Sequence, residues 1–260
     1  MAAETPKVSA IYRYPVKGLS PEALERVRLA VGATLPSDRL YAIENGPSGF
    51  DPAAARYMPK QRYLMLMRNE RLAWLRTRLD DASQTLVIET DGREAARGDL
   101  RTPAGRAAIE QFLAGFCADE LRGPPKVLHA PGFSFSDVAS KVVSIVNLSS
   151  VAAIEDLVGA PVNPLRFRAN VYVTGWPAWH EFELLGQEIA IGPDAYGSCA
   201  RLKVVKRIMR CAATNVDPGT GIRDLAIPDT LLRNLGHADC GVYAEVLEAG
   251  EIAVGDDLRS

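Results

Sequence analysis

Short runs that alternate apolar and polar residues dominate the chain and predict β-strands. Residues 8–14 are β-branched and aromatic in loose alternation, and similar runs follow at 24–31 and 39–43. Many short strands with few helices predict a β-rich α+β protein with a barrel-like or sandwich core, not an alternating parallel sheet. Further strand-like runs occupy residues 86–88, 126–129, 142–146, 167–173, 188–191, 202–208 and 242–247.

Helical periodicity is confined to a few segments. Leu72, Leu75 and Leu79 fall at three- and four-residue spacing and predict a short amphipathic helix before the strand at 86–88. Thr102-Pro103 is a cap and first-turn pair, and the apolar face that follows predicts a helix over 103–116. Two more helices are predicted in the second half, one after Ser149 or Ser150 and one from about Pro228 to Leu235.

A loop and a proline pair suggest how the chain is divided. Residues 44–62 are rich in Gly, Pro and polar groups and predict a long loop. Gly123-Pro124-Pro125 is the best candidate for a domain junction, because proline has no amide to donate to a ladder and the composition changes there. The sequence therefore predicts two domains, residues 1–120 and residues 121–260.

Composition and charge narrow the class of protein. The chain has 260 residues, of which 47% are hydrophobic, and a formal net charge of −2, which predicts a soluble globular protein. So small a net charge gives no global electrostatic reason to bind nucleic acid or an anionic membrane. No run of about eighteen apolar residues occurs, and the amino terminus lacks the pattern of a secretion signal. We therefore expect a cytoplasmic protein without nucleic-acid or membrane partners.

The four cysteines and three histidines are widely spaced. No two cysteines have the Cys-x-x-Cys spacing of a zinc ribbon or an iron–sulfur cluster, so we expect reduced thiols. Cys117, beside Phe116, and Cys240, beside Gly241, are expected to be structural. Cys199 is expected to lie in a loop.

The sharpest chemical signal is Cys211, which follows Arg210 and precedes the turn Asp217-Pro218-Gly219. A thiol beside concentrated positive charge favours the thiolate, which attacks electrophiles or binds soft metals. The alternative is a buried cysteine that acts as a small hydrophobe, with the basic residues on the solvated face of a strand. The basic residues that precede Cys211 are Arg201, Lys203, Lys206, Arg207 and Arg210.

A second candidate is the segment Arg166-Phe167-Arg168-Ala169-Asn170, where the start of a strand would supply two arginines on one face and a short amide. Guanidinium groups suit the recognition of phosphate or carboxylate. Lys17 and Arg39, each at the edge of a predicted strand, are candidates for the same anion pocket. The alternative is a surface strand with exposed arginines.

Together these motifs resemble the MOSC-domain proteins that carry an N-terminal β-barrel domain, the group that includes the mitochondrial amidoxime reducing component and its bacterial relatives. The resemblance implies an N-terminal β-barrel-like domain followed by a MOSC β-barrel domain with a few helices. The matching segments are Tyr14-Pro15-Val16-Lys17-Gly18, Asp38-Arg39, Arg166-Phe167-Arg168-Ala169-Asn170, Arg210-Cys211 with residues 214–221, and Gly241-Val242-Tyr243-Ala244.

In that family a cysteine ligates the molybdenum of a pterin cofactor, and basic and small polar residues hold the cofactor's phosphate. The resemblance therefore implies that Cys211 is the metal ligand and the catalytic residue. The chain departs from the family at Gly18 and Met209, where serine is common. The residues that the resemblance assigns to cofactor binding are Lys17, Gly18, Arg39, Arg168, Asn170, Arg210 and Thr214.

The resemblance implies a molybdenum-cofactor oxidoreductase that reduces N-hydroxylated compounds. Its electrons would come from a separate protein of the flavin-reductase or ferredoxin type, since the chain has neither cluster-type cysteine spacing nor a flavin fingerprint. A second hypothesis is a non-catalytic carrier of the molybdenum cofactor or of sulfur on Cys211. A third keeps Cys211 as a plain thiol in a scaffold or binding module.

Overall fold

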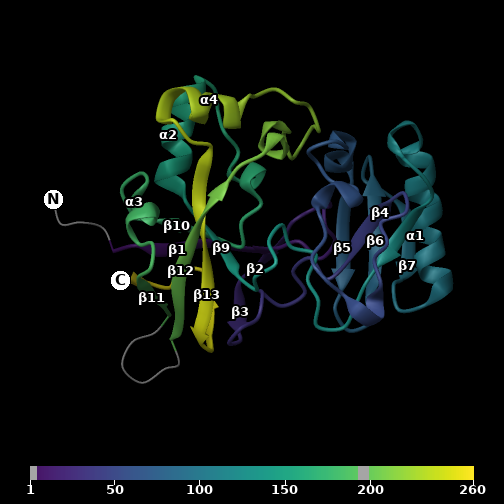
Figure 1. Ribbon diagram of the computed structural model, residues 1–260, viewed down its shortest axis with the longest axis horizontal. Helices are drawn as coiled ribbons and strands as arrows, with labels where there is room; N and C mark the ends of the chain where they lie inside the picture. Colours follow the sequence, from purple (N-terminus) through teal and green to yellow (C-terminus); the bar gives the residue numbers. More distant parts are fainter. Residues whose placement is uncertain (1–4, 193–198) are drawn as a thin grey trace.

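The computed structural model describes residues 5–192 and 199–260, which form two lobes side by side (Figure 1). An eight-stranded sheet is the centre of one of them, the large-sheet lobe. Within this sheet β9 and β10 are parallel, and the other described pairs are antiparallel. The strands follow the order β15 (Leu258–Arg259), β11 (Glu188–Ile191), β12 (Ala200–Met209), β13 (Asp239–Glu248), β9 (Val143–Asn147), β10 (Val171–Thr174), β1 (Lys7–Arg13) and β2 (Glu22–Leu24).

The remaining elements of the large-sheet lobe are helices, 3₁₀ turns and one short ribbon. They are α2 (Leu148–Val158), α3 (His180–Glu183), α4 (Ile227–Leu235), the turns η5 (Pro164–Phe167) and η6 (Ala212–Asn215), and the antiparallel pair β3 (Arg26–Leu29) and β14 (Gly250–Ala253). Helices α2 and α4 lie side by side (Figure 1). Ile154 of α2 and Leu231 of α4 belong to one buried core together with Val146 of β9. Within residues 5–192 and 199–260, none of the helices has the length and apolar character needed to cross a bilayer.

Alternation of side chains explains the large sheet. Along β12, Ala200, Leu202 and Val204 are buried, whereas Arg201 and Lys203 between them are exposed. Successive side chains of a strand point to opposite faces, so apolar residues at every second position form the core. Arg201 and Lys203, the first two basic residues of the run before Cys211, therefore lie on the solvated face of the strand.

The small lobe, residues 36–128, contains a three-stranded antiparallel sheet and one long helix, α1, that packs beside β7. Its core includes Leu72, Leu86, Ile88, Ile109 and Leu113. The elements are β4 (Ala42–Asn45), β5 (Arg76–Asp80), β6 (Thr85–Thr90), β7 (Arg93–Asp99), α1 (Pro103–Phe116) and β8 (Pro125–Leu128), with the 3₁₀ turns η1 (Pro52–Ala54), η2 (Lys60–Arg62), η3 (Glu70–Trp74) and η4 (Ala118–Glu120).

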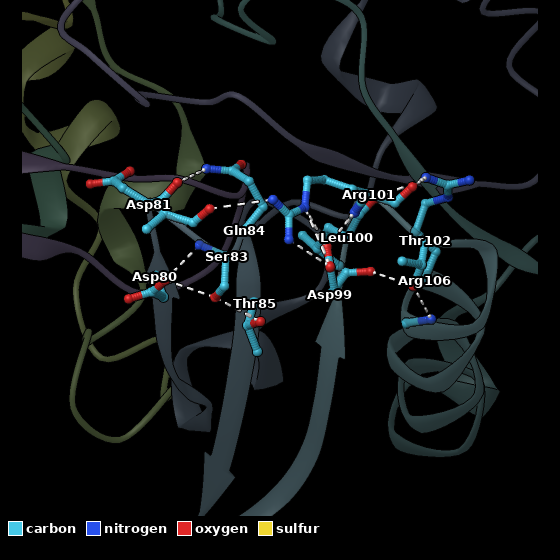
Figure 2. Close-up of polar contacts among 12 residues, drawn as sticks. Asp80, Asp81, Ser83, Gln84, Thr85, Asp99, Leu100, Arg101, Thr102 and Arg106 are labelled. Carbon is cyan, nitrogen blue, oxygen red and sulfur yellow. Dashed lines mark hydrogen bonds and ion pairs between the residues drawn. The ribbon is translucent and has the colours of Figure 1, made fainter.

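The junction between β7 and α1 is fixed by polar contacts, which Figure 2 shows. Thr102 caps the helix by accepting a hydrogen bond of 3.0 Å from the Gly105 amide, and Arg101 forms an ion pair with Asp99 at 2.8 Å. A Cβ on Gly105 would lie 2.1 Å from the Asp99 carbonyl oxygen. The helix therefore approaches the strand at a distance that only glycine permits.

The structure confirms the β-rich α+β class and the helix over 103–116, which has the predicted bounds. Predicted strands correspond to β1, β6, β8, β9, β11, β12 and β13, and predicted helices to α2 and α4. The run at 24–31 is split into β2 and β3. Strands β7, β14 and β15 and helix α3 lie in segments for which the pattern predicts no element.

The helix predicted from Leu72, Leu75 and Leu79 is wrong. Glu70–Trp74 form a 3₁₀ turn, and β5 begins at Arg76. Leu75 and Leu79 are both buried, but residues four apart share a face in a strand as well as in a helix. Leucine spacing alone therefore does not distinguish the two structures.

Two strands begin later than predicted, because a residue near each predicted start has a left-handed backbone conformation. Arg39 and Arg168 both have φ of 50°, which interrupts an extended run. Strand β4 begins at Ala42 and β10 at Val171, so both arginines lie in turns. Arg166 and Arg168 consequently do not share the face of a strand, contrary to the prediction.

The predicted domain boundary near residue 120 stays a prediction. Sheet pairing crosses this position, since β1 pairs with β10 and β4 pairs with β8. Val8, Ile11 and Leu29 belong to the core of the large-sheet lobe. In spatial terms, the small lobe is inserted between strands of the large-sheet lobe.

Gly105→Ala is expected to destabilise the protein by about 1–3 kcal/mol, because the added methyl group would overlap the Asp99 carbonyl. Gly115→Ala, in the same helix, is the control: its Cβ would meet nothing within 4 Å. That change is expected to stabilise the protein by up to about 1 kcal/mol through helix propensity. Urea unfolding measures both, and equal effects would contradict the close β7–α1 contact.

Candidate functional site

A cavity of about 330 Å³ lies where the two lobes meet. All the residues that the sequence assigns to the candidate site line this cavity. They are Lys17, Gly18, Arg39, Arg168, Asn170, Arg210, Cys211 and Thr214. The structure therefore brings together segments that are up to about two hundred residues apart.

The path of the chain explains why these segments meet. Strand β1 belongs to the large sheet, but Val16 and Leu19, which follow it, are buried in the core of the small lobe. Lys17 and Gly18 are thereby held at the junction. The 3₁₀ turn η6, which follows β12, reaches the same junction from the other side, because Ala213 and Val216 pack against the small-lobe core.

Cys211 lies between the end of β12 and the start of η6. Its side chain is half-buried and faces the cavity. Its carbonyl oxygen accepts hydrogen bonds of 3.0 Å from both the amide and the hydroxyl of Thr214, which closes the turn. Thr214 therefore positions the cysteine backbone, and its hydroxyl hydrogen is already used within the protein.

Arg166 holds the loop that carries Cys211 from the large-sheet side. Its side chain is 1% exposed and forms ion pairs with Asp217 at 3.2 Å and Asp224 at 2.7 Å. It also donates to the carbonyls of Thr214 and Asn215, at 3.4 and 3.1 Å. Arg166 is therefore a positioning residue for this loop.

Arg223 ties the same loop to the small lobe. Its guanidinium donates to the carbonyl of Ala212 at 3.0 Å, and to those of Leu66 and Met67 at 3.0 and 2.8 Å. It also pairs with Glu70 at 2.9 Å. One side chain thus links the residue after Cys211 to the opposite wall of the cavity.

Tyr14 carries two guanidinium groups on its ring, that of Arg168 at 4.2 Å from the centroid and that of Arg39 at 4.8 Å. Arg39 donates to the carbonyl of Arg168 at 3.0 Å and pairs with the buried carboxylate of Asp38. Burial opposes the charge of Arg39, but Asp38 outweighs burial and raises the Arg39 pKa above its ordinary value. Arg39 is therefore held in place by an ion pair and a backbone contact.

Arg168 differs from Arg39 in having an unused guanidinium. Among residues 5–192 and 199–260, no acceptor lies within hydrogen-bonding distance of its side-chain nitrogens, although the residue lines the cavity. Burial lowers the pKa of Arg168 to about 10, so it still carries its charge at neutral pH. A half-buried cation with free donors facing a cavity is suited to bind an anion.

Lys17 is paired to a carboxylate that the sequence does not point to. Its buried ammonium donates to the Phe135 carbonyl at 2.8 Å and forms an ion pair with Asp137. Burial would raise the pKa of Asp137, but Lys17 and Lys60 outweigh it and hold that pKa well below its usual range. Asp137 is therefore ionised at neutral pH.

Lys60 is a second cavity residue outside the predicted set. Burial opposes its charge, but Asp137 and then Cys211 raise the Lys60 pKa above its ordinary value. Lys60 begins the 3₁₀ turn η2 and Asp137 lies in a loop, and neither periodicity nor a motif marks either residue. Only the folded chain shows that they face Cys211 and Lys17.

Asn170 and Arg210 have mainly internal partners. The side-chain oxygen Oδ1 of Asn170 accepts hydrogen bonds from the backbone amide and the hydroxyl of Ser144 at 3.1 and 2.8 Å. Its side-chain nitrogen Nδ2 donates to the Tyr12 carbonyl at 3.2 Å. Arg210 donates to the carbonyls of Cys240 and Phe167 at 2.7 and 2.8 Å. Both side chains join elements around the cavity.

Gly18 has a structural reason to depart from serine. Its φ is 85°, and a Cβ there would lie 3.0 Å from the Leu64 carbonyl oxygen. A side chain would thus be strained by the backbone as well as crowded by the small lobe. The other departure, Met209, is 78% exposed and borders the cavity.

The other cysteines have different surroundings. Cys117 and Cys240 are buried, as expected for structural residues, and burial raises their pKa values to about 11 and about 12. Cys199 is half-buried and precedes β12; the loop residues just before it lie outside the described part of the chain. Within the described residues, no cluster of three or more His, Cys, Asp or Glu side chains could hold a metal ion.

Comparison with known families identifies the chain. The MOSC domain model matches residues 130–259, and the model of the MOSC N-terminal beta barrel domain matches residues 5–119. The chain therefore belongs to the MOSC domain family, and its first half has the fold of the N-terminal barrel domain. MOSC domains are associated with binding of the molybdenum cofactor.

Two solved structures resemble the chain more distantly. The YUAD protein from Bacillus subtilis is 15% identical with a TM-score of 0.45, over 98% of this chain and 94% of that protein. YiiM from Geobacillus stearothermophilus is 20% identical with a TM-score of 0.33, over 45% of this chain and 52% of that protein. No curated protein sequence matches the chain significantly.

The residues of the cavity fit a phosphorylated pterin with a bound metal. Cys211 offers a half-buried sulfur, and a single thiolate suits a metal that receives its other ligands from a cofactor. Arg168 offers unused donors for a phosphate. A volume of about 330 Å³ falls in the range of small-molecule sites.

Arg166→Met is expected to lower the free energy of unfolding by about 2–4 kcal/mol. The change leaves Asp217 and Asp224 without their buried partner, although their partial exposure moderates the cost. Arg201→Met is the control, because its ion pairs with Glu188 and Glu248 are exposed and should contribute less than about 1 kcal/mol. Urea unfolding distinguishes the two, and a loss below 1 kcal/mol for Arg166→Met would contradict its anchoring role.

Proposed function

We propose that the protein is a molybdenum-cofactor oxidoreductase that reduces N-hydroxylated compounds, with Cys211 as the metal ligand. The observation that carries this proposal is that the half-buried Cys211 side chain and the unused guanidinium of Arg168 line one cavity. A soft sulfur donor and a free cation are the two groups that a metal-bearing pterin phosphate requires. The family membership supports the same cofactor.

Each side chain has a definite part in this proposal. Cys211 would hold the metal, and Arg168 would bind the phosphate. Arg39 keeps Arg168 in place through the Arg168 carbonyl, and Arg223 keeps Ala212 against the cavity wall. When bound, the cofactor supplies two-electron oxygen-atom transfer.

The proposed reaction also requires an electron donor and a substrate. The donor is proposed to be a separate protein of the flavin-reductase or ferredoxin type. The substrate class follows from the resemblance of the motifs to the amidoxime-reducing group. Lys60, which interacts with Cys211, is a cation that a small substrate would meet on the Cys211 side of the cavity.

Metal and pterin analysis of purified protein tests the cofactor. Wild-type protein from a cofactor-competent host is expected to contain molybdenum and pterin, and Cys211→Ala to lose most of the molybdenum. Cys199→Ala is the matched control, since it removes another half-buried thiol that does not line the cavity. Equal molybdenum in the wild type and in Cys211→Ala would contradict the ligand assignment.

Turnover distinguishes the reductase from a carrier. Cofactor-loaded protein with an artificial electron donor is expected to reduce an amidoxime or a hydroxylamine, and Cys211→Ala to lose this activity. Loaded protein that binds molybdenum but gives no turnover would favour the carrier hypothesis instead.

A further inference from the structure

We propose that Asp137 determines which anions enter the cavity: its carboxylate occupies the position of a ligand's anion beside Lys17, and a ligand must displace it. The pairing itself is independent of the proposed function. Only the identification of the natural ligand as a pterin phosphate rests on that function.

Two carboxylates line the described cavity wall, and they differ in how firmly they are held. Asp38 is 5% exposed, accepts a hydrogen bond of 2.8 Å from the Tyr14 amide and pairs with Arg39. The side chain of Asp137 is 48% exposed, and its described side-chain partner is Lys17. Asp38 is part of the framework, whereas Asp137 is half-exposed and is held mainly by lysines, so a competing anion can displace it.

The loop around Asp137 is anchored just before this residue. The Phe135 amide donates to the Arg39 carbonyl at 2.8 Å, and the Ser134 hydroxyl donates to the Asp38 carbonyl at 2.9 Å. Beyond Phe135, the Asp137 carbonyl accepts one bond of 3.2 Å from the exposed Tyr57 hydroxyl. Rotation of the Asp137 side chain therefore requires no disruption of the anchored segment.

Lys17 cannot leave in place of Asp137. Its side chain is 7% exposed, and its ammonium also donates to the Phe135 carbonyl. An entering anion would therefore meet a fixed lysine whose charge is already neutralised by Asp137. That carboxylate has the same sign of charge as the anion. Like charges at close range disfavour binding strongly.

Selectivity follows from this competition. A small free anion contacts only the basic side chains of the cavity and must break the ion pair between Lys17 and Asp137, so it should bind poorly. A larger ligand with further contacts, such as those to Cys211 and Arg168, can displace the carboxylate and still bind tightly. Asp137 thus excludes abundant inorganic anions from a strongly cationic cavity.

Titration of metal-free, cofactor-free protein with inorganic pyrophosphate tests the proposal by calorimetry at constant ionic strength. Asp137→Asn is expected to bind pyrophosphate about 10-fold or more tightly than the wild type, since removal of the carboxylate frees Lys17. Asp119→Asn is the control, because Asp119 is exposed and outside the cavity lining, yet the change in net charge is the same.

The Lys17→Met variant shows whether Asp137 acts through Lys17 or only through the net charge of the protein. In Lys17→Met protein, the further change Asp137→Asn is expected to give a clearly smaller gain in pyrophosphate affinity, because Lys17 is absent and only Lys60 is left to benefit. Equal or weaker binding by Asp137→Asn, or an undiminished gain without Lys17, would overturn the proposal. Tighter binding by Asp137→Asn in a protein that never carries molybdenum would leave this proposal standing and refute the proposed function.

Discussion

Two arginines that donate to backbone carbonyls fix the loop that carries Cys211. Arg166 binds this loop from the large-sheet lobe, and Arg223 joins it to the small lobe. A guanidinium has several donors in a rigid plane, so one side chain can restrain several carbonyls at once. The position of the thiol therefore depends on both lobes, and neither lobe alone forms the cavity.

The cavity concentrates positive charge that the fold must accommodate without a ligand. Asp38 pairs with Arg39, Asp137 pairs with Lys17, and the ring of Tyr14 supports both Arg39 and Arg168. Buried charges are tolerated when they are paired. Arg168 lacks such a partner, because its side-chain nitrogens make no hydrogen bond or ion pair within the described residues although it lines the cavity. Sites that depart from the rules of stability in this way are commonly functional.

The sequence predicts much of this architecture because its strands alternate and α1 has a clear cap. Prediction fails where one spacing fits two structures, as for Leu75 and Leu79, and where backbone in the left-handed region breaks an extended run, as at Arg168. All eight predicted site residues line the cavity, but their individual partners follow from tertiary contacts. Lys60 and Asp137 could not be predicted, since one lies in a short 3₁₀ turn and the other in a loop, and both acquire their significance only beside Cys211 and Lys17.

If Cys211 is the metal ligand, a bound cofactor covers its sulfur. Alkylation with iodoacetamide, followed by peptide mass spectrometry, compares cofactor-loaded and cofactor-free protein most directly, with Cys199 as an internal reference thiol. Cys211 is expected to be alkylated in the cofactor-free protein and protected in the loaded protein, while Cys199 reacts equally in both. Equal alkylation of Cys211 in the two forms would contradict its role as the metal ligand.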